Sequence, residues 1–249
     1  MTNFYKKKYF FYCLFLMSYF SYSMDSGLLL EGTRVIYSEN AKNGVTFNIT
    51  NNTDKIFLLQ SRISEWDKIK STDEVKSNIS KKNNIHELPF IVVPPLSRFE
   101  PEQKMTLHIQ MIKDTLPKDR ESIFSLSLKT IPNQEKLDKK NKLIIALQNN
   151  IKLFYRPDNL IEMDLNSKLD SIQFNISEKK LIVKNTTPYY LTLSKLSSNK
   201  INLLSNGDNM IAPFGEVNYL SDKELNNIIH WQILDDDGRM SRIAERIIN

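Results

Sequence analysis

The sequence contains few of the residues from which catalytic, metal and cofactor sites are usually built. Its 249 residues include one cysteine, three histidines and six glycines. The histidines, His86, His108 and His230, have no metal-ligand spacing, and no HExxH, GxSxG, Walker A or GxGxxG motif occurs. One cysteine cannot form an internal disulfide, so packed cores must stabilise the fold. These absences predict that the protein is not an enzyme and needs neither a metal nor a cofactor.

Residues 1–23 are typical of a secretory signal peptide. Three consecutive lysines precede an apolar and aromatic stretch over residues 9–22, and Ser21 and Ser23 supply the small residues of a cleavage site. The alternative, a membrane anchor, needs roughly 20 apolar residues, and this stretch is shorter. Cleavage would remove Cys13, three lysines and no acid, which lowers the formal net charge from +5 to +2. We therefore expect an exported chain that is not inserted in a membrane and does not bind nucleic acid.

Short segments with alternating apolar residues follow, and turn-forming residues separate them. Alternation of this kind predicts half-buried β-strands, and the regular spacing of the turns is typical of an immunoglobulin-like sandwich. A polar stretch over residues 65–87 and a charged stretch over residues 134–140 predict surface loops. The predicted strands of this first part cover residues 27–37, 45–50, 56–63, 90–93, 96–100, 105–112, 121–131 and 142–156. Asn51 to Asp54 are predicted to form a turn.

A second domain is predicted after residues 156–159, where Arg-Pro-Asp-Asn interrupts the pattern and indicates a linker. Shorter strands are expected at residues 172–176, 180–185, 189–195, 218–220 and 230–234. We therefore predict an all-β protein with two immunoglobulin-like β-sandwich domains joined by a short hinge. The expected boundaries are 1–23 for the signal peptide, 24–156 for the first domain and 157–249 for the second.

The strand predicted at residues 142–156 is about twice the usual length. Leu143, Ile145 and Leu147 alternate along it, and two asparagines and the absence of a helix cap favour a strand over a helix. A strand of this length must extend beyond its own domain or bend between two. From the residues alone, the three apolar side chains fit the core of their own sandwich.

Six sequence blocks resemble, in the same order, the motifs of periplasmic pilus chaperones of the chaperone–usher pathway. Glu102 stands where that family usually has glycine, and Thr186 replaces a proline. No cysteine pair flanks the long strand and the loop before it is short, so the chain is similar to the short-loop branch. The matching blocks are GTRVIY at 32–37, FIVVPPLSRFEP at 90–101, DRES at 119–122 with IP at 131–132, IALQNNIKLFYRP at 145–157, NTTPYY at 185–190 and MIAPF at 210–214.

The resemblance implies a role for the long strand. Leu143, Ile145 and Leu147 would be inserted into a pilus subunit that lacks its last strand, which is β-strand addition. Arg34 and Lys152 would hold the C-terminal carboxylate of the subunit in the cleft between the domains, since both side chains suit a carboxylate. Lys152 is out of phase with Leu143 and Leu147. A bulge or a strong twist near Asn149 and Asn150 would reconcile the two sets, but the sequence does not show one.

Glu121, Arg156 and Asp236 match an ion cluster that, in the family, fixes the angle of a boomerang-shaped pair of domains. The resemblance thus implies a periplasmic chaperone without catalytic activity. Its partners would be pilus subunits and an outer-membrane usher, and the strand could also mediate self-association. The alternative is an exported two-domain adhesin or glycan-binding module, which glycan binding without any subunit partner would identify.

Overall fold

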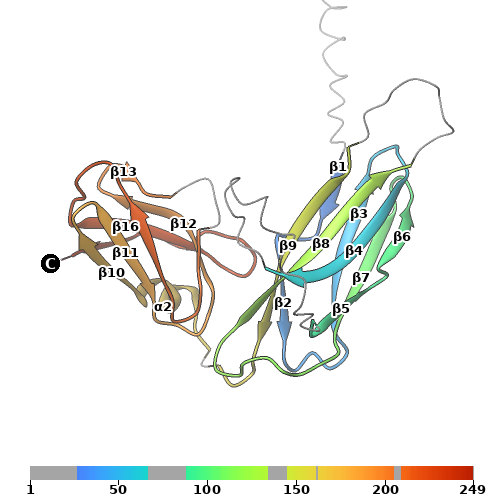
Figure 1. Ribbon diagram of the computed structural model, residues 1–249, viewed down its shortest axis with the longest axis horizontal. Helices are drawn as coiled ribbons and strands as arrows, with labels where there is room; N and C mark the ends of the chain where they lie inside the picture. Colours follow the sequence, from blue (N-terminus) through green and yellow to red (C-terminus); the bar gives the residue numbers. More distant parts are fainter. Residues whose placement is uncertain (1–26, 67–87, 134–144, 161, 205–208, 249) are drawn as a thin grey trace, which may run out of the picture.

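Two β-sandwiches lie side by side in the structure, which is a computed structural model (Figure 1). It describes residues 27–66, 88–133, 145–160, 162–204 and 209–248. The predicted all-β fold with two immunoglobulin-like sandwiches is confirmed. The predicted signal peptide and most of the two predicted surface loops lie outside the described residues.

The N-terminal sandwich consists of two sheets that enclose one core. Its four-stranded sheet has the order β1 (Gly27–Leu30), β3 (Val45–Asn52), β7 (Lys104–Met111) and β5 (Phe90–Val93). Its five-stranded sheet has the order β2 (Arg34–Ser38), β9 (Leu147–Arg156), β8 (Ser122–Pro132), β4 (Phe57–Glu65) and β6 (Leu96–Phe99). Fully buried side chains from both sheets meet between them, among them Ile49, Leu107, Leu126 and Leu153.

The C-terminal sandwich has its own core around Trp231, whose indole Nε1 donates a hydrogen bond to the carbonyl of Leu169 (3.1 Å). One sheet has the order β10 (Ile172–Ser177), β11 (Lys180–Asn185) and β15 (Glu216–Leu220). The other has the order β13 (Ile201–Asn202), β12 (Leu191–Ser198), β16 (Ile228–Leu234) and β17 (Ala244–Ile247), with β14 (Met210–Ile211) paired to β12. The helix α2 (Leu165–Asp170) begins at Asp164, whose carboxylate accepts a hydrogen bond from the Ser167 amide (2.6 Å).

The sequence pattern missed α2, β13, β14 and β17. A helix of six residues and strands of two to four residues are too short to show a period. The predicted turn at residues 51–54 is wrong for its first two residues. Asn51 and Asn52 belong to β3, because they pair with Leu28 and Gly27 of β1.

The long strand also begins later than predicted. Among the described residues, β9 starts at Leu147, whereas Ile145 and Ala146 lie outside it, and residues 142–144 are not described. The last pair of the β8–β9 ladder joins Thr130 to Leu147. A strand exists only where a neighbour accepts and donates its backbone hydrogen bonds, so β9 begins where its ladder to β8 begins.

Candidate functional site

One edge of β9 is half uncovered. On one side β9 pairs with β8 along nearly all of its length, from Leu147 to Tyr155. On the other side it pairs with β2 in parallel, and this ladder starts only at Arg34 opposite Lys152. We call the β2-facing side of Leu147 to Ile151 the open edge of β9, since no described strand pairs with it. Unpaired backbone groups on a strand edge can accept a strand from another chain.

Exposed apolar side chains lie at the beginning of this open edge. Ile145 and Leu147 are each 62% exposed, although Ile151 and Leu153 further along the same strand are buried in the core. Leu147 has the same parity as these core residues, so it lies on the core face of the sheet, but at the open edge, where it stays exposed. Ile145 and Leu147 therefore do not fill their own core. Leu143, the third predicted donor residue, lies outside the described residues.

Arg34 and Lys152 are brought together by the fold. They are Cα partners in the parallel ladder between β2 and β9, at the end of the open edge. The β8–β9 ladder has no register shift, so β9 has no bulge near Asn149 and Asn150. Side chains alternate along an unbroken strand, which places Lys152 on the opposite face from Leu147. The cation pair and Leu147 thus lie on opposite faces of the five-stranded sheet.

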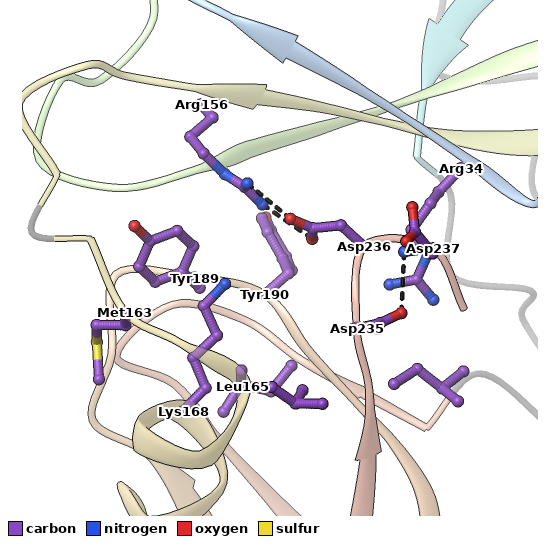
Figure 2. A pocket seen from close by; sticks show the side chains of 12 residues that line it. Arg34, Arg156, Met163, Leu165, Lys168, Tyr189, Tyr190, Asp235, Asp236 and Asp237 are labelled. Carbon is purple, nitrogen blue, oxygen red and sulfur yellow. Dashed lines mark hydrogen bonds and ion pairs between the residues drawn. The ribbon is translucent and has the colours of Figure 1, made fainter. Parts of the chain in front are cut away.

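Arg34 lies in the cleft between the two sandwiches (Figure 2). It lines a cavity of about 230 Å³, which Arg156 also borders from the N-terminal sandwich, and Lys168 and Asp236 from the C-terminal one. The shielded Nε atom of Arg34 has no hydrogen-bond partner among the described residues. Burial lowers the pKa of Arg34, and the nearby carboxylates, first that of Asp236, partly oppose this shift. The guanidinium of Arg34 borders the cleft, and a guanidinium is a suitable partner for an incoming carboxylate.

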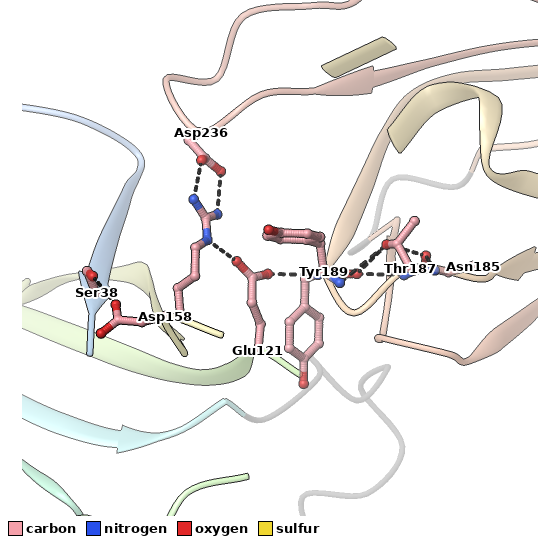
Figure 3. Close-up of polar contacts among 9 residues, drawn as sticks. Ser38, Glu121, Asp158, Asn185, Thr187, Tyr189 and Asp236 are labelled. Carbon is pink, nitrogen blue, oxygen red and sulfur yellow. Dashed lines mark hydrogen bonds and ion pairs between the residues drawn. The ribbon is translucent and has the colours of Figure 1, made fainter. Parts of the chain in front are cut away.

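Glu121, Arg156 and Asp236, the interdomain cluster, lie in contact (Figure 3). Arg156 Nε donates to Glu121 Oε1 (2.7 Å), while Nη1 and Nη2 donate to the two carboxylate oxygens of Asp236 (2.7 and 3.0 Å). Glu121 Oε2 accepts a further hydrogen bond from the backbone amide of Tyr190 (2.8 Å). The cluster therefore joins the residue before β8 and the last residue of β9 in the first sandwich to two loops of the second.

The members of the interdomain cluster differ in burial, and their pKa values differ accordingly. The side chain of Glu121 is 2% exposed, that of Arg156 23% and that of Asp236 44%. Burial raises the pKa of Glu121, although the Arg156 charge opposes the shift. Burial also acts to raise the pKa of Asp236, but hydrogen bonds and charge from Arg156 outweigh it, so this pKa is lowered. Glu121 is thus the member whose charge depends most on its partner.

Two aromatic contacts across the same interface were not predicted. The rings of Phe154 and Tyr190 lie 5.7 Å apart, and the Arg120 guanidinium lies 5.2 Å from the centre of the Phe214 ring. The NTTPYY and MIAPF motifs marked Tyr190 and Phe214, but nothing in a single sequence identifies the residues that they contact. Domain docking therefore combines ionic and aromatic contacts.

The described residues hold no group of three or more side chains suited to a metal ion. Among these residues there is also no helix with the length and apolarity needed to cross a membrane.

The fold and the cleft define a two-domain β-sandwich protein of the pilus-chaperone type. Residues 27–161 match the family described as "Pili and flagellar-assembly chaperone, PapD N-terminal domain", and residues 167–244 match "Pili assembly chaperone PapD, C-terminal domain". The chain belongs to this family of pilus assembly chaperones, which confirms the resemblance found in its motifs.

Curated relatives and solved structures agree with this assignment. The chain is 30% identical to the chaperone protein HifB of Haemophilus influenzae over 95% of both chains. It is 30% identical to the probable fimbrial chaperone SfmC of Escherichia coli K12, over 90% of this chain and 89% of SfmC. The crystal structure of the E. coli chaperone DraB superimposes with a TM-score of 0.70 at 26% identity, covering 89% of this chain and 97% of DraB. The SafB chaperone of Salmonella enterica, solved with the SafA pilin, shares the fold (TM-score 0.73, 24% identity, 89% and 96% covered).

Proposed function

We propose that this chain is a periplasmic chaperone that binds pilus subunits through the open edge of β9 and delivers them to an outer-membrane usher. The observation that carries the proposal is the position of Arg34 and Lys152 at the end of that edge, beside exposed Ile145 and Leu147. The role is binding and not catalysis. Secretion by the predicted signal peptide, and usher delivery, follow from family membership and are part of the proposal.

The geometry favours one direction for the incoming strand. A strand that pairs with the open edge lies in line with β2 and ends where β2 begins, at Arg34. If it runs parallel to β9, its C-terminus meets Arg34 and Lys152; if it runs antiparallel, its N-terminus does. Two cations attract a carboxylate and repel an ammonium, so the parallel direction is favoured. The C-terminal strand of a subunit would then pair with the open edge and end at the two cations.

The apolar residues would contribute most of the affinity. Burial of Ile145 and Leu147 in a subunit groove is worth about 1.5–3 kcal/mol for each side chain, before the costs of association are subtracted. A groove left by a missing strand would also cover the unpaired backbone of the open edge. We expect Leu143 to add to this stripe.

Periplasmic co-expression with the pilus subunits of the same genome tests the proposal. We expect the wild type to co-purify with a subunit in a one-to-one complex, and Lys152→Ala and Ile145→Asp to lose most of it. The matched controls are Lys179→Ala and Leu220→Asp, because Lys179 is an exposed lysine and Leu220 is 79% exposed, both on the C-terminal sandwich. A folded wild type that retains no subunit would overturn the proposal and direct attention to glycan binding.

A further inference from the structure

Four side chains form a row on the outer face of the five-stranded sheet. Arg34 pairs with Lys152, Lys152 with Ser125, and Ser125 with Ser64, so the row crosses β2, β9, β8 and β4. Their sequence neighbours Val35, Leu153, Leu126 and Ile63 point into the core. Alternation therefore places all four members of the row on the face opposite the core. The half of this row that lies on β8 and β4 carries short side chains.

Trp66 lies beyond Ser64, at the end of this row that is farthest from Arg34. It follows β4 directly, two residues after Ser64 and with the same parity. Ser64 and Ser125 are too short to separate the indole from β9. The Lys152 Nζ atom lies 5.2 Å from the centre of the Trp66 ring, within the range of a cation–π interaction. A side chain of β9 and one that follows β4 thus meet across β8.

The two cations of the anchor are held in different ways. Arg34 is half-buried, and the charges of Asp236, Asp235 and Glu121 act on it. Lys152 carries its charge on a flexible four-carbon stem, and ordering such a chain costs conformational entropy. The Trp66 ring attracts the ammonium through its π face and contributes no hydrogen-bond acceptor atom. An ammonium has three N–H donors, so a carboxylate can approach from the side away from the ring.

We propose that Trp66 is a positioning residue for the Lys152 ammonium, which it holds on the outer face of the sheet, in the row of Arg34, ready for the C-terminal carboxylate of a bound subunit. This inference rests on the function proposed above. Trp66 itself would touch no part of the carboxylate. Because Lys152 would already be ordered before the subunit binds, the conformational entropy that it loses on binding would be smaller.

Competition for one subunit measures the effect directly. A tagged complex of wild type and its co-purified subunit is mixed with an equal amount of an untagged variant, and the equilibrium partition gives the ratio of affinities. We expect Trp66→Leu to bind about 2- to 5-fold more weakly than wild type, because leucine keeps apolar contact but has no π face. Trp66→Phe should lie between the two. Thermal unfolding of each variant verifies that it is folded.

A Lys152→Met background separates positioning from packing. If Trp66 acts through the ammonium, Trp66→Leu causes no further loss in that background. Equal partition of the Phe and Leu variants, or an undiminished loss in the Lys152→Met background, would overturn the inference while the chaperone function stands. If the wild type forms no complex with any subunit, the proposed function itself fails. The co-expression experiment, which is done before the competition, shows this.

Discussion

The two sandwiches contain the same local device, in which a buried asparagine closes a proline turn. In the first sandwich Asn51 Nδ2 donates to the carbonyls of Lys55 (2.7 Å) and Glu100 (2.9 Å), and its Oδ1 accepts from Thr53 Oγ1 (2.7 Å). The Asn51 amide donates to the carbonyl of Gln103 (3.0 Å). One side chain thus connects the end of β3 to the turn before β7.

Asn185 makes the corresponding bonds in the second sandwich (Figure 3). Its Nδ2 donates to the carbonyls of Tyr189 (2.6 Å) and Ala212 (3.0 Å), its Oδ1 accepts from Thr187 Oγ1 (2.8 Å), and its amide donates to Gly215 (2.9 Å). The spacing of asparagine, threonine and carbonyl is identical in the two domains. The device is therefore a property of the sandwich and not of the cleft.

The difference between the two copies lies in what surrounds them. After Asn185 the chain continues into Tyr189 and Tyr190, which contact the interdomain cluster, and its proline turn carries Phe214 against Arg120. Among the described residues, the turn residue Glu102 of the first copy forms no hydrogen bond, ion pair or ring contact with the other domain. The same device thus connects two segments within the first domain, whereas in the second domain it also supports the interface between the domains.

Removal of Arg156 should have the largest effect on the interface. Arg156→Ala leaves Glu121 buried without its guanidinium partner, and we expect a loss of about 3 kcal/mol in the free energy of unfolding, with lower periplasmic yield. Asp236→Ala should cost less, because Asp236 is 44% exposed. Urea unfolding measures both, with Arg239→Ala as control, since that side chain is 79% exposed. Unchanged unfolding and yield of Arg156→Ala would contradict this view of the cluster.

Replacement of the two asparagines tests whether the devices are equivalent. Asn51→Ala and Asn185→Ala each remove several side-chain hydrogen bonds to backbone carbonyls, and each should cost about 2 kcal/mol. We expect Asn185→Ala alone to weaken domain docking as well, because Tyr189 and Tyr190 follow it. Urea unfolding reports the first effect, and limited proteolysis of the linker the second. Equal linker cleavage in the two variants would show that the device does not support the interface.

The pH dependence of stability should distinguish Glu121 from Asp236. The pKa of Glu121 is raised above its ordinary value of 4.5, so the folded chain retains a proton that the unfolded chain has released. Its contribution to stability therefore falls as pH rises through this window. The pKa of Asp236 is lowered, so its contribution is lost as pH falls through the folded pKa.

Glu121→Gln should accordingly cost less stability at about pH 7 than at about pH 5, and Asp236→Asn should cost less at about pH 3 than at about pH 5. Unfolding in urea at the three pH values measures both differences, which we expect to be smaller than the loss caused by Arg156→Ala. The same sign for the two variants would contradict the assignment.

The smallest expected effect concerns the turn residues of the two devices. Glu102 and Phe214 both have a φ of +56°, a left-handed conformation that favours glycine after proline. Glu102→Gly should therefore stabilise by about 1 kcal/mol. Phe214→Gly relieves the same strain but loses the contact with Arg120, so we expect little net gain. Thermal unfolding compares the two, and an equal gain would show that the Arg120 contact contributes nothing.

Much of the first sandwich was predictable because alternation is local. The strands over residues 56–63, 105–112 and 121–131 were placed within two residues at each end, since apolar side chains alternate strictly there. The N-terminal limit of β9 was not predicted correctly. The strand pattern of residues 142–156 begins before Leu147, the first residue that pairs with β8. Pattern shows which residues suit a strand, but a neighbouring strand decides whether they form one.

The features of the candidate site likewise divide into those that the sequence predicted and those that only the structure shows. The sequence by itself determined the types of side chain available: alternating aliphatics on a long strand, an arginine and a lysine suited to a carboxylate, and no metal or catalytic constellation. Only the tertiary structure decided that Arg34 and Lys152 are partners, that Ile145 and Leu147 leave the core, and that Trp66 reaches Lys152. The physical reason is that side-chain alternation follows from the geometry of one strand. Strand pairing and register instead depend on segments far apart in the chain.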